Sequence, residues 1–137
     1  MPVQVLTTTK SWFMKEQRKD KMRLEHMLQA IDRIQIHAGS LTREEIESDV
    51  LRYYGIVKNI EIIGEAARML TDEFKSAHPD VPWLSIANMR NFLVHEYFQV
   101  DNDTIWSVIH GDIIELREYV VRYLSDTDWE KWANENV

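Results

Sequence analysis

The sequence contains no cysteine and little glycine or proline. Its 137 residues include four glycines and three prolines. The absence of cysteine excludes disulfides, zinc–thiolate sites and a cysteine nucleophile. Because glycine and proline interrupt regular structure, their scarcity favours long ordered elements. No apolar run approaches the roughly 18 residues that span a bilayer, and the N-terminus lacks the basic start and apolar stretch of a signal peptide. These absences favour a cytoplasmic protein without a membrane segment.

Positive charge is also scarce. Acidic residues outnumber Lys and Arg by 23 to 16, which gives a formal net charge of −7. Proteins that bind nucleic acid usually gather Lys and Arg against the phosphates, so this balance argues against RNA binding over a broad surface. The same charge balance is equally compatible with a domain that binds a small molecule or a protein. Any RNA site must therefore be local, with cations from a few positions or from a second subunit.

Apolar residues recur at three- and four-residue spacings through most of the chain, which is the pattern of amphipathic helices. No stretch alternates with a period of two for long enough to indicate a sheet. The predicted helices run from about Arg18 to Ala38, from Ile46 to about Phe74 with a break near Ser48-Asp49, from Pro82-Trp83 to about Tyr97, and from Asp101 or Asp103 to about Leu124. We therefore predict one all-α bundle of four to five helices over residues 17–124. An N-terminal tail or strap (1–16) and an acidic C-terminal tail (125–137) flank it.

Two local signals sharpen this prediction. Thr42 and Glu45 have the spacing of a capping box, which marks a helix start. Gly64 lies in the middle of a predicted helix, where it costs about 1 kcal/mol relative to alanine. Because Ala66 and Ala67 lie beside it, we expect another helix to approach closely at Gly64.

The segment from Asn88 to Tyr97 concentrates polar chemistry among apolar residues. At 100° per residue, Asn91 and His95 form an i, i+4 pair, and Tyr97 projects almost over Arg90. Arg90 and His95 are about 140° apart on an ideal helix, so they meet only if the arginine reaches round or a second subunit contributes. The apolar side predicted to enter the core consists of Met89, Phe92 and Leu93.

These side chains match the needs of RNA cleavage without metal. The imidazole of His95 can act as base or acid near neutral pH, the guanidinium of Arg90 can stabilise charge on a phosphate, and Asn91 can orient either group. Spacing alone decides little, because an Arg-x4-His pair arises by chance in about one in three chains of this composition. The alternative is an ordinary helix end with Arg90 and His95 in solvent and Tyr97 packed.

Other charged residues could support such a site. We expect Glu65 to pair with an arginine near it, and Arg90 is the obvious candidate. Arg68, one turn further on, either adds positive charge to an RNA groove or lies on a solvated helix face. His26, His37 and His78 do not have a metal-ligand spacing with nearby carboxylates, so neither a metal nor another cofactor is expected.

Several blocks in a fixed order closely resemble the HepT-like branch of the HEPN superfamily. The blocks are Ile62–Ala67, Val81–Trp83, Ile86, Met89–Phe98, Val100-Asp101 and Ile105-Trp106. The resemblance extends from about Arg18 to Leu124. It implies an α-helical bundle that dimerises and a metal-independent endoribonuclease in which the RNA 2′-hydroxyl attacks the phosphodiester. Arg90 and His95 match the family's catalytic pair, which meets at the dimer interface, and Asn91 matches the polar residue after the arginine.

The resemblance also implies a partner. Such proteins are toxins of type VII toxin–antitoxin modules, whose antitoxin, MntA, is a minimal nucleotidyltransferase that adenylylates the tyrosine at the position of Tyr97. A second hypothesis is a non-catalytic binding partner and substrate of a nucleotidyltransferase, in which the motif serves recognition only. A plain helical scaffold is a third.

Overall fold

The computed structural model describes residues 16–95 and 102–134, with side chains for residues 16–90 and 102–134. The helices are α2 (Asp20–Ala38), α3 (Arg43–Ser48), α4 (Val50–Met69), α5 (Asp72–Ala77), α6 (Trp83–His95), α7 (Asn102–Ser107), the π-helical turn η1 (Val108–Asp112), α8 (Ile113–Asp126) and α9 (Trp129–Asn134). Within these ranges there is no strand, so the prediction of an all-α bundle is confirmed. No helix of the described ranges is long and apolar enough to cross a membrane.

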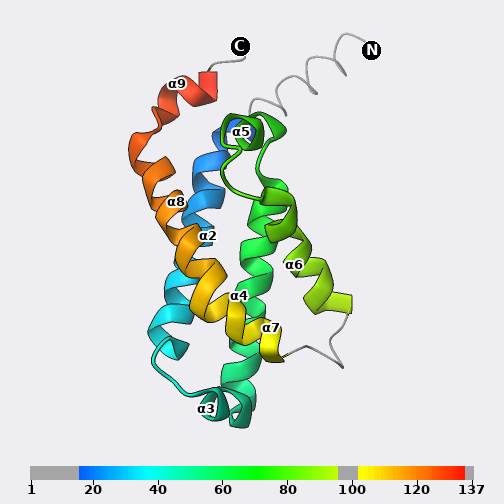
Figure 1. Ribbon diagram of the computed structural model, residues 1–137. Coiled ribbons are helices and arrows are strands. Elements are labelled where there is room, and N and C mark those ends of the chain that lie inside the picture. The colour runs from blue at the N-terminus through cyan, green and yellow to red at the C-terminus, as the bar shows by residue number, and fades with distance from the viewer. Residues whose placement is uncertain (1–15, 96–101, 135–137) are drawn as a thin grey trace.

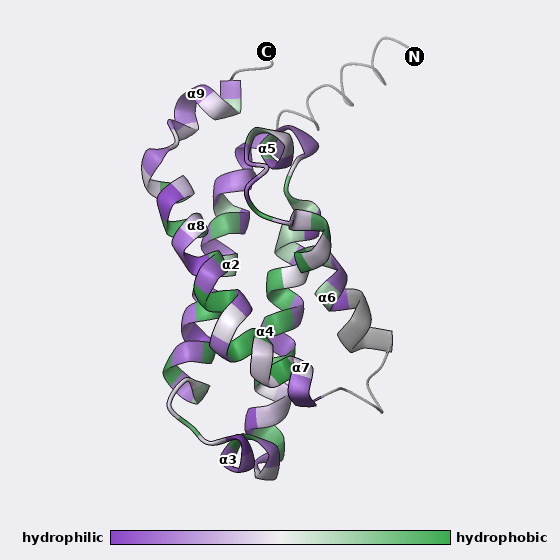
Figure 2. Ribbon diagram, viewed as in Figure 1, coloured by the Kyte–Doolittle hydropathy of each residue, from purple (hydrophilic) through white to green (hydrophobic). Residues whose placement is uncertain are grey.

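Helix α4 is the central element of the bundle. It packs against α2 on one side and α6 on the other, and α2 also packs against α8 (Figure 1). Helices α2 and α6 run in one direction and α4 runs in the opposite one. Hydrophobic residues concentrate on α4 and on the parts of α2 and α8 that face it (Figure 2). The largest fully buried apolar side chains are Phe74, Leu24, Met27, Ile31, Ile34, Ile60, Ile63, Ile109, Ile113 and Val120.

Side-chain caps set the helix boundaries near α3. The backbone N–H of Glu45 donates to the Thr42 hydroxyl at 3.1 Å, and the Thr42 N–H donates to the Glu45 carboxylate at 3.2 Å. This confirms the predicted capping box. Asp49 then ends α3 and caps α4, where its carboxylate accepts from the Arg52 N–H at 3.1 Å. The predicted break near Ser48-Asp49 is therefore present.

The predicted C-terminal end of the second helix is wrong. The helix was expected to continue to about Phe74, but α4 ends at Met69 and Leu70 is extended. The Thr71 hydroxyl accepts from the Phe74 N–H at 3.2 Å and begins α5. Asp20 of α2 fixes this break, because its buried carboxylate accepts from the Thr71 N–H at 2.9 Å and from the Thr71 hydroxyl at 2.6 Å.

Helix α7, the turn η1 and helix α8 follow one another without a break over residues 102–126, and η1 and α8 pack against α2. The π-helical turn η1 joins α7 to α8, and the sequence pattern did not predict it. Helix α8 ends at Asp126, close to the predicted end. Trp129 and Trp132 of α9 pack against the core, and the Trp132 indole N–H donates to Asp20 at 3.0 Å. A cap by Asp101 lies outside the described residues.

Candidate active site

Gly64 allows α6 to approach α4 closely at Arg90. A Cβ atom built on Gly64 would lie 2.9 Å from the Arg90 Cβ, 3.0 Å from the Arg90 backbone nitrogen and 3.2 Å from the Ile86 carbonyl oxygen. Two of these neighbours are backbone atoms, which cannot move without shifting the helix. The close approach expected at this glycine is therefore present, and it determines where Arg90 sits on the bundle.

Glu65 holds the Arg90 guanidinium in place. The Arg90 Nη1 lies 3.0 Å from the Glu65 Oε2, and the side chains are about one-third and two-fifths exposed. Arg68 donates to the same carboxylate at 2.8 and 3.3 Å. The hydrogen bond from Arg68 lowers the pKa of the Glu65 carboxyl, and the charges of both arginines lower it further against the opposing effect of burial. Glu65 is thus an anion shared by two arginines, as expected for its pairing with Arg90.

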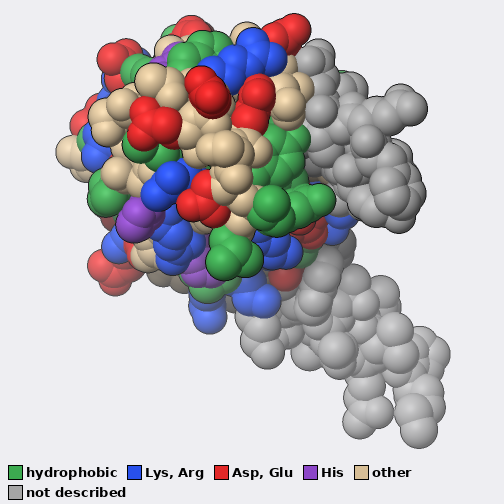
Figure 3. Space-filling view, turned by 90° about the horizontal axis from the view of Figure 1, so that it is seen from below, with side chains coloured by type: hydrophobic (Ala, Val, Ile, Leu, Met, Phe, Trp, Pro, Cys, Tyr) green, Lys and Arg blue, Asp and Glu red, His purple; other side chains and the backbone are tan. Residues whose placement is uncertain are grey.

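Arg90 lines a groove of about 530 Å³ whose floor is α4 and whose other wall is α2. Its lining residues are Lys19, Met22, Arg23, His26, Lys58, Glu61, Ile62, Glu65, Ala66, Met69 and Arg90. Four Lys and Arg side chains and two carboxylates line it, an excess of two positive charges among the lining residues. Glu16, beside the groove, also pairs with Arg23 and Lys19. The whole chain carries −7. Seen from below, Lys, Arg and His side chains gather toward one side of the molecule with exposed apolar side chains among them (Figure 3). The groove is therefore a candidate site for an anion on an acidic protein.

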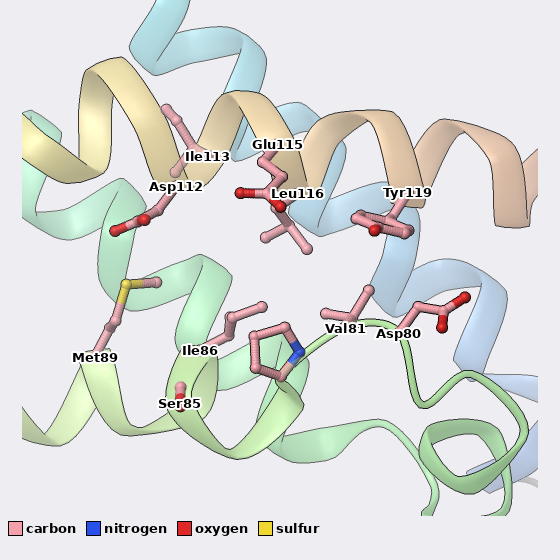
Figure 4. A pocket seen from close by; sticks show the side chains of 11 residues that line it. Asp80, Val81, Ser85, Ile86, Met89, Asp112, Ile113, Glu115, Leu116 and Tyr119 are labelled. Carbon is pink, nitrogen blue, oxygen red and sulfur yellow. The ribbon is translucent and has the colours of Figure 1, made fainter.

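A second hollow has the opposite character. About 240 Å³ in volume, it lies between α6 and α8, where apolar side chains from both helices point toward one another (Figure 4). Asp80, Asp112 and Glu115 also line it, and no Lys or Arg is among its lining residues. Its negative charge would repel phosphate, so the groove at Arg90 is the better candidate for an RNA site.

The structure brings together some of the predicted site residues. Arg90, Glu65 and Arg68 form one ion-pair cluster. The backbone of Asn91 and His95 belongs to the same helix as Arg90, while their side chains and Tyr97 lie outside the described parts. Among the residues that the structure describes, no group of three or more His, Asp and Glu side chains could hold a metal ion.

Sequence reasoning missed the contribution of α2 to this groove. Lys19, Met22, Arg23 and His26 recur at three- and four-residue spacings, so they share a helix face, but their neighbours across the groove come from α4 and α6. Lys58 is exposed, pairs with Glu61 at 3.7 Å and also lines the groove. Only the polar i, i+4 pattern on α2 could have indicated this face.

Comparisons with known proteins identify the family of this chain. The family model described as "Ribonuclease HepT-like" matches residues 27–123. "Probable ribonuclease HepT" of Thermococcus cleftensis is 35% identical over 76% of this chain and 93% of its own length. "Putative RNase TTE0752" of Caldanaerobacter subterraneus subsp. tengcongensis is 39% identical over 74% of this chain and 90% of its own.

A longer relative also matches. "Gamma-glutamylcyclotransferase and putative RNase MJ0434" of Methanocaldococcus jannaschii is 33% identical over 88% of this chain, which spans about half (54%) of that protein. No solved structure matches the chain. The family model covers well over half of the sequence, and we therefore conclude that the chain belongs to the HepT-like ribonuclease family.

Proposed function

We propose that this protein is a metal-independent endoribonuclease of the HEPN type. The observation that carries the proposal is Arg90, which Gly64 and Glu65 hold at a cationic groove on an otherwise acidic chain. Clustered cations attract an RNA backbone, and a fixed guanidinium stabilises the charge that develops on the phosphate during cleavage. Family membership supports the same reaction.

Cleavage in this proposal begins when a substrate phosphate replaces Glu65 on the Arg90 guanidinium. His95 takes the proton from the RNA 2′-hydroxyl, whose oxygen attacks phosphorus, and Asn91 positions these groups. Guanidinium pairs a phosphate as well as a carboxylate in two-point geometry. Glu65 therefore acts as a placeholder that keeps Arg90 oriented until RNA binds.

The complete site is proposed to need two copies of the chain. On an ideal helix Arg90 and His95 are about 140° apart, so a second α6 can supply the missing group. Large apolar side chains are exposed at the start of α4, and among them Leu51 is 86% exposed and Val50 63%. A stable dimer buries about 800 Å² on each partner, and an apolar surface of this kind suits such a contact.

The same proposal includes control by an antitoxin. In it the protein is the toxin of a type VII module that acts on cytoplasmic RNA, and a cognate MntA-like nucleotidyltransferase adenylylates Tyr97. On an ideal helix Tyr97 would project over Arg90. An AMP group there would add bulk and negative charge where the substrate phosphate binds, which would block cleavage.

The test is RNA cleavage by the purified protein with EDTA present. We expect wild type to cleave and both His95→Ala and Arg90→Ala to lose activity, and we expect wild type but not His95→Ala to arrest growth on expression. Intact mass after co-expression with a cognate MntA-like nucleotidyltransferase should show additions of AMP that Tyr97→Phe lacks. If wild type gains AMP but cleaves no RNA, the protein is instead a non-catalytic binding partner and substrate of the nucleotidyltransferase.

A further inference from the structure

Helix α2 places a second histidine in the groove that contains Arg90. His26 is exposed and lines the groove from the wall opposite α6. Met22 precedes it by four residues, so the two side chains lie on the same face of α2. Within the described parts of the chain His26 takes part in no ion pair, hydrogen bond or ring contact, whereas His78 packs on Phe74 and His110 on Trp106.

The helix register places His26 near the height of Arg90. A buried Arg23 guanidinium donates to the Met69 carbonyl oxygen, which ties α2 to the end of α4. From Met69 back to Gly64, which contacts Arg90, is about 7.5 Å along α4 at 1.5 Å per residue. From Arg23 to His26 is about 4.5 Å along α2, and because the two helices are antiparallel both steps lead in the same direction (Figure 1). The heights differ by less than one helical turn.

We propose that His26 is a further catalytic residue, the acid that protonates the leaving oxygen during RNA cleavage. The inference rests on the proposed ribonuclease function. It adds a second proton-transfer group from α2, so that His26 of one copy acts on the same phosphate as His95, which a second copy can supply. A groove of about 530 Å³ is large enough for a nucleotide.

The reaction needs an acid as well as a base. Attacking and leaving oxygens lie roughly in line on opposite sides of phosphorus, so base and acid must approach from opposite sides. His95 accepts the 2′-hydroxyl proton as the 2′-oxygen–phosphorus bond forms. The phosphorus–5′-oxygen bond breaks, and the 5′-oxygen takes the His26 proton. The products are a 2′,3′-cyclic phosphate and a 5′-hydroxyl end.

Charged groups on every wall of the groove surround His26. They are Lys19 and Arg23 from α2, Lys58, Glu61 and Glu65 from α4, and Arg90 from α6. The Arg23 guanidinium donates to the Met69 carbonyl oxygen and, at 2.6 Å, to the Glu16 carboxylate. Lys58 and Arg90 are paired with Glu61 and Glu65. His26 is thus the only imidazole among the described residues that line this groove.

The experiment compares two RNA linkages in single-turnover cleavage. One substrate has an ordinary phosphodiester at the cut, and the other has sulfur in place of the bridging 5′-oxygen. Because a thiolate leaves without a proton, the second substrate does not need an acid. We expect His26→Ala to cleave the oxygen substrate about 10²–10⁴-fold more slowly than wild type. On the sulfur substrate the loss should be under about 10-fold, and the limb of the pH–rate profile due to the acid should disappear.

His37→Ala is the matched control, because His37 is exposed on the same helix and outside the groove. It should behave as wild type on both substrates. His26→Asn is a second variant in case His26→Ala disturbs folding, and circular dichroism checks that both variants are folded. A wild-type rate for His26→Ala, or an equal loss of rate on both substrates, would overturn the role of His26 and leave the proposed function standing. Failure of wild type to cleave either substrate would overturn the proposed function as well.

Discussion

Replacing Gly64 with alanine tests whether the contact between α4 and α6 determines the position of Arg90. In an open helix position the change would stabilise the protein by about 1 kcal/mol, because alanine has the higher helix propensity. At Gly64 the new Cβ would lie 2.9 Å from the Arg90 Cβ and 3.0 Å from its backbone nitrogen. Overpacking of this kind costs about 1–3 kcal/mol. The two effects together predict a net change between zero and about 2 kcal/mol of destabilisation.

Gly55 provides a matched control within the same helix. A Cβ atom at Gly55 meets no described atom within 4 Å. Gly55→Ala should therefore raise the free energy of unfolding by about 1 kcal/mol. The two variants differ from wild type by the same methyl group in the same helix, so the difference between them isolates the contact with α6.

Urea denaturation followed by far-ultraviolet circular dichroism measures both changes. With a slope of about 1–3 kcal/mol/M, 1 kcal/mol moves the midpoint by about 0.3–1 M. Cleavage of RNA should fall for Gly64→Ala, since a displacement of about 1 Å at a catalytic group can cost 10²-fold in rate, and remain normal for Gly55→Ala. Equal stabilisation by the two substitutions would refute the role assigned to Gly64.

Three further predictions concern the groups that hold the bundle together. Glu65→Gln should lower the free energy of unfolding by less than about 1 kcal/mol, because the ion pair is exposed. Since arginines lower the pKa of Glu65 in the folded state, this loss should be present at neutral pH and vanish as the pH falls below the ordinary pKa of 4.5. Urea denaturation at a series of pH values measures it. Asp20→Ala should destabilise by about 2–4 kcal/mol, because Thr71 and Trp132 lose their acceptor, and tryptophan fluorescence should report the release of α9. Burial raises the pKa of Asp20, so its contribution favours folding at low pH and weakens as pH rises, and Asp20→Asn should remove that dependence. Thr42→Ala should lower the free energy of unfolding by about 0.5–2 kcal/mol through loss of the cap on α3, and a change below 0.3 kcal/mol would contradict the capping box.

Much of the fold could be predicted from local patterns. Caps and periodicity depend on residues within one or two turns, so the capping box at Thr42 and the start of α6 at Trp83 were visible in the sequence. The end of α4 was not, because Asp20 from a distant helix stabilises the break at Thr71. The Thr-Asp-Glu run after Leu70 has the pattern of a helix start, but the apolar spacing continues through it and favours one long helix.

The sequence by itself determined the helical class, the glycine at which two helices meet, and the pairing of Glu65 with Arg90. Each of these follows from residue types and spacings along one or two helices. Only the tertiary structure decided that α2 and α6 form opposite walls over α4, so that His26 and Arg90, 64 positions apart in the numbering, line one groove. It also decided that an acidic chain has a local excess of positive charge there. The net charge of a sequence sums the charges on all surfaces of the protein, whereas a bound phosphate interacts mainly with the few charges within about one Debye length. The packing of the helices determines which charges those are.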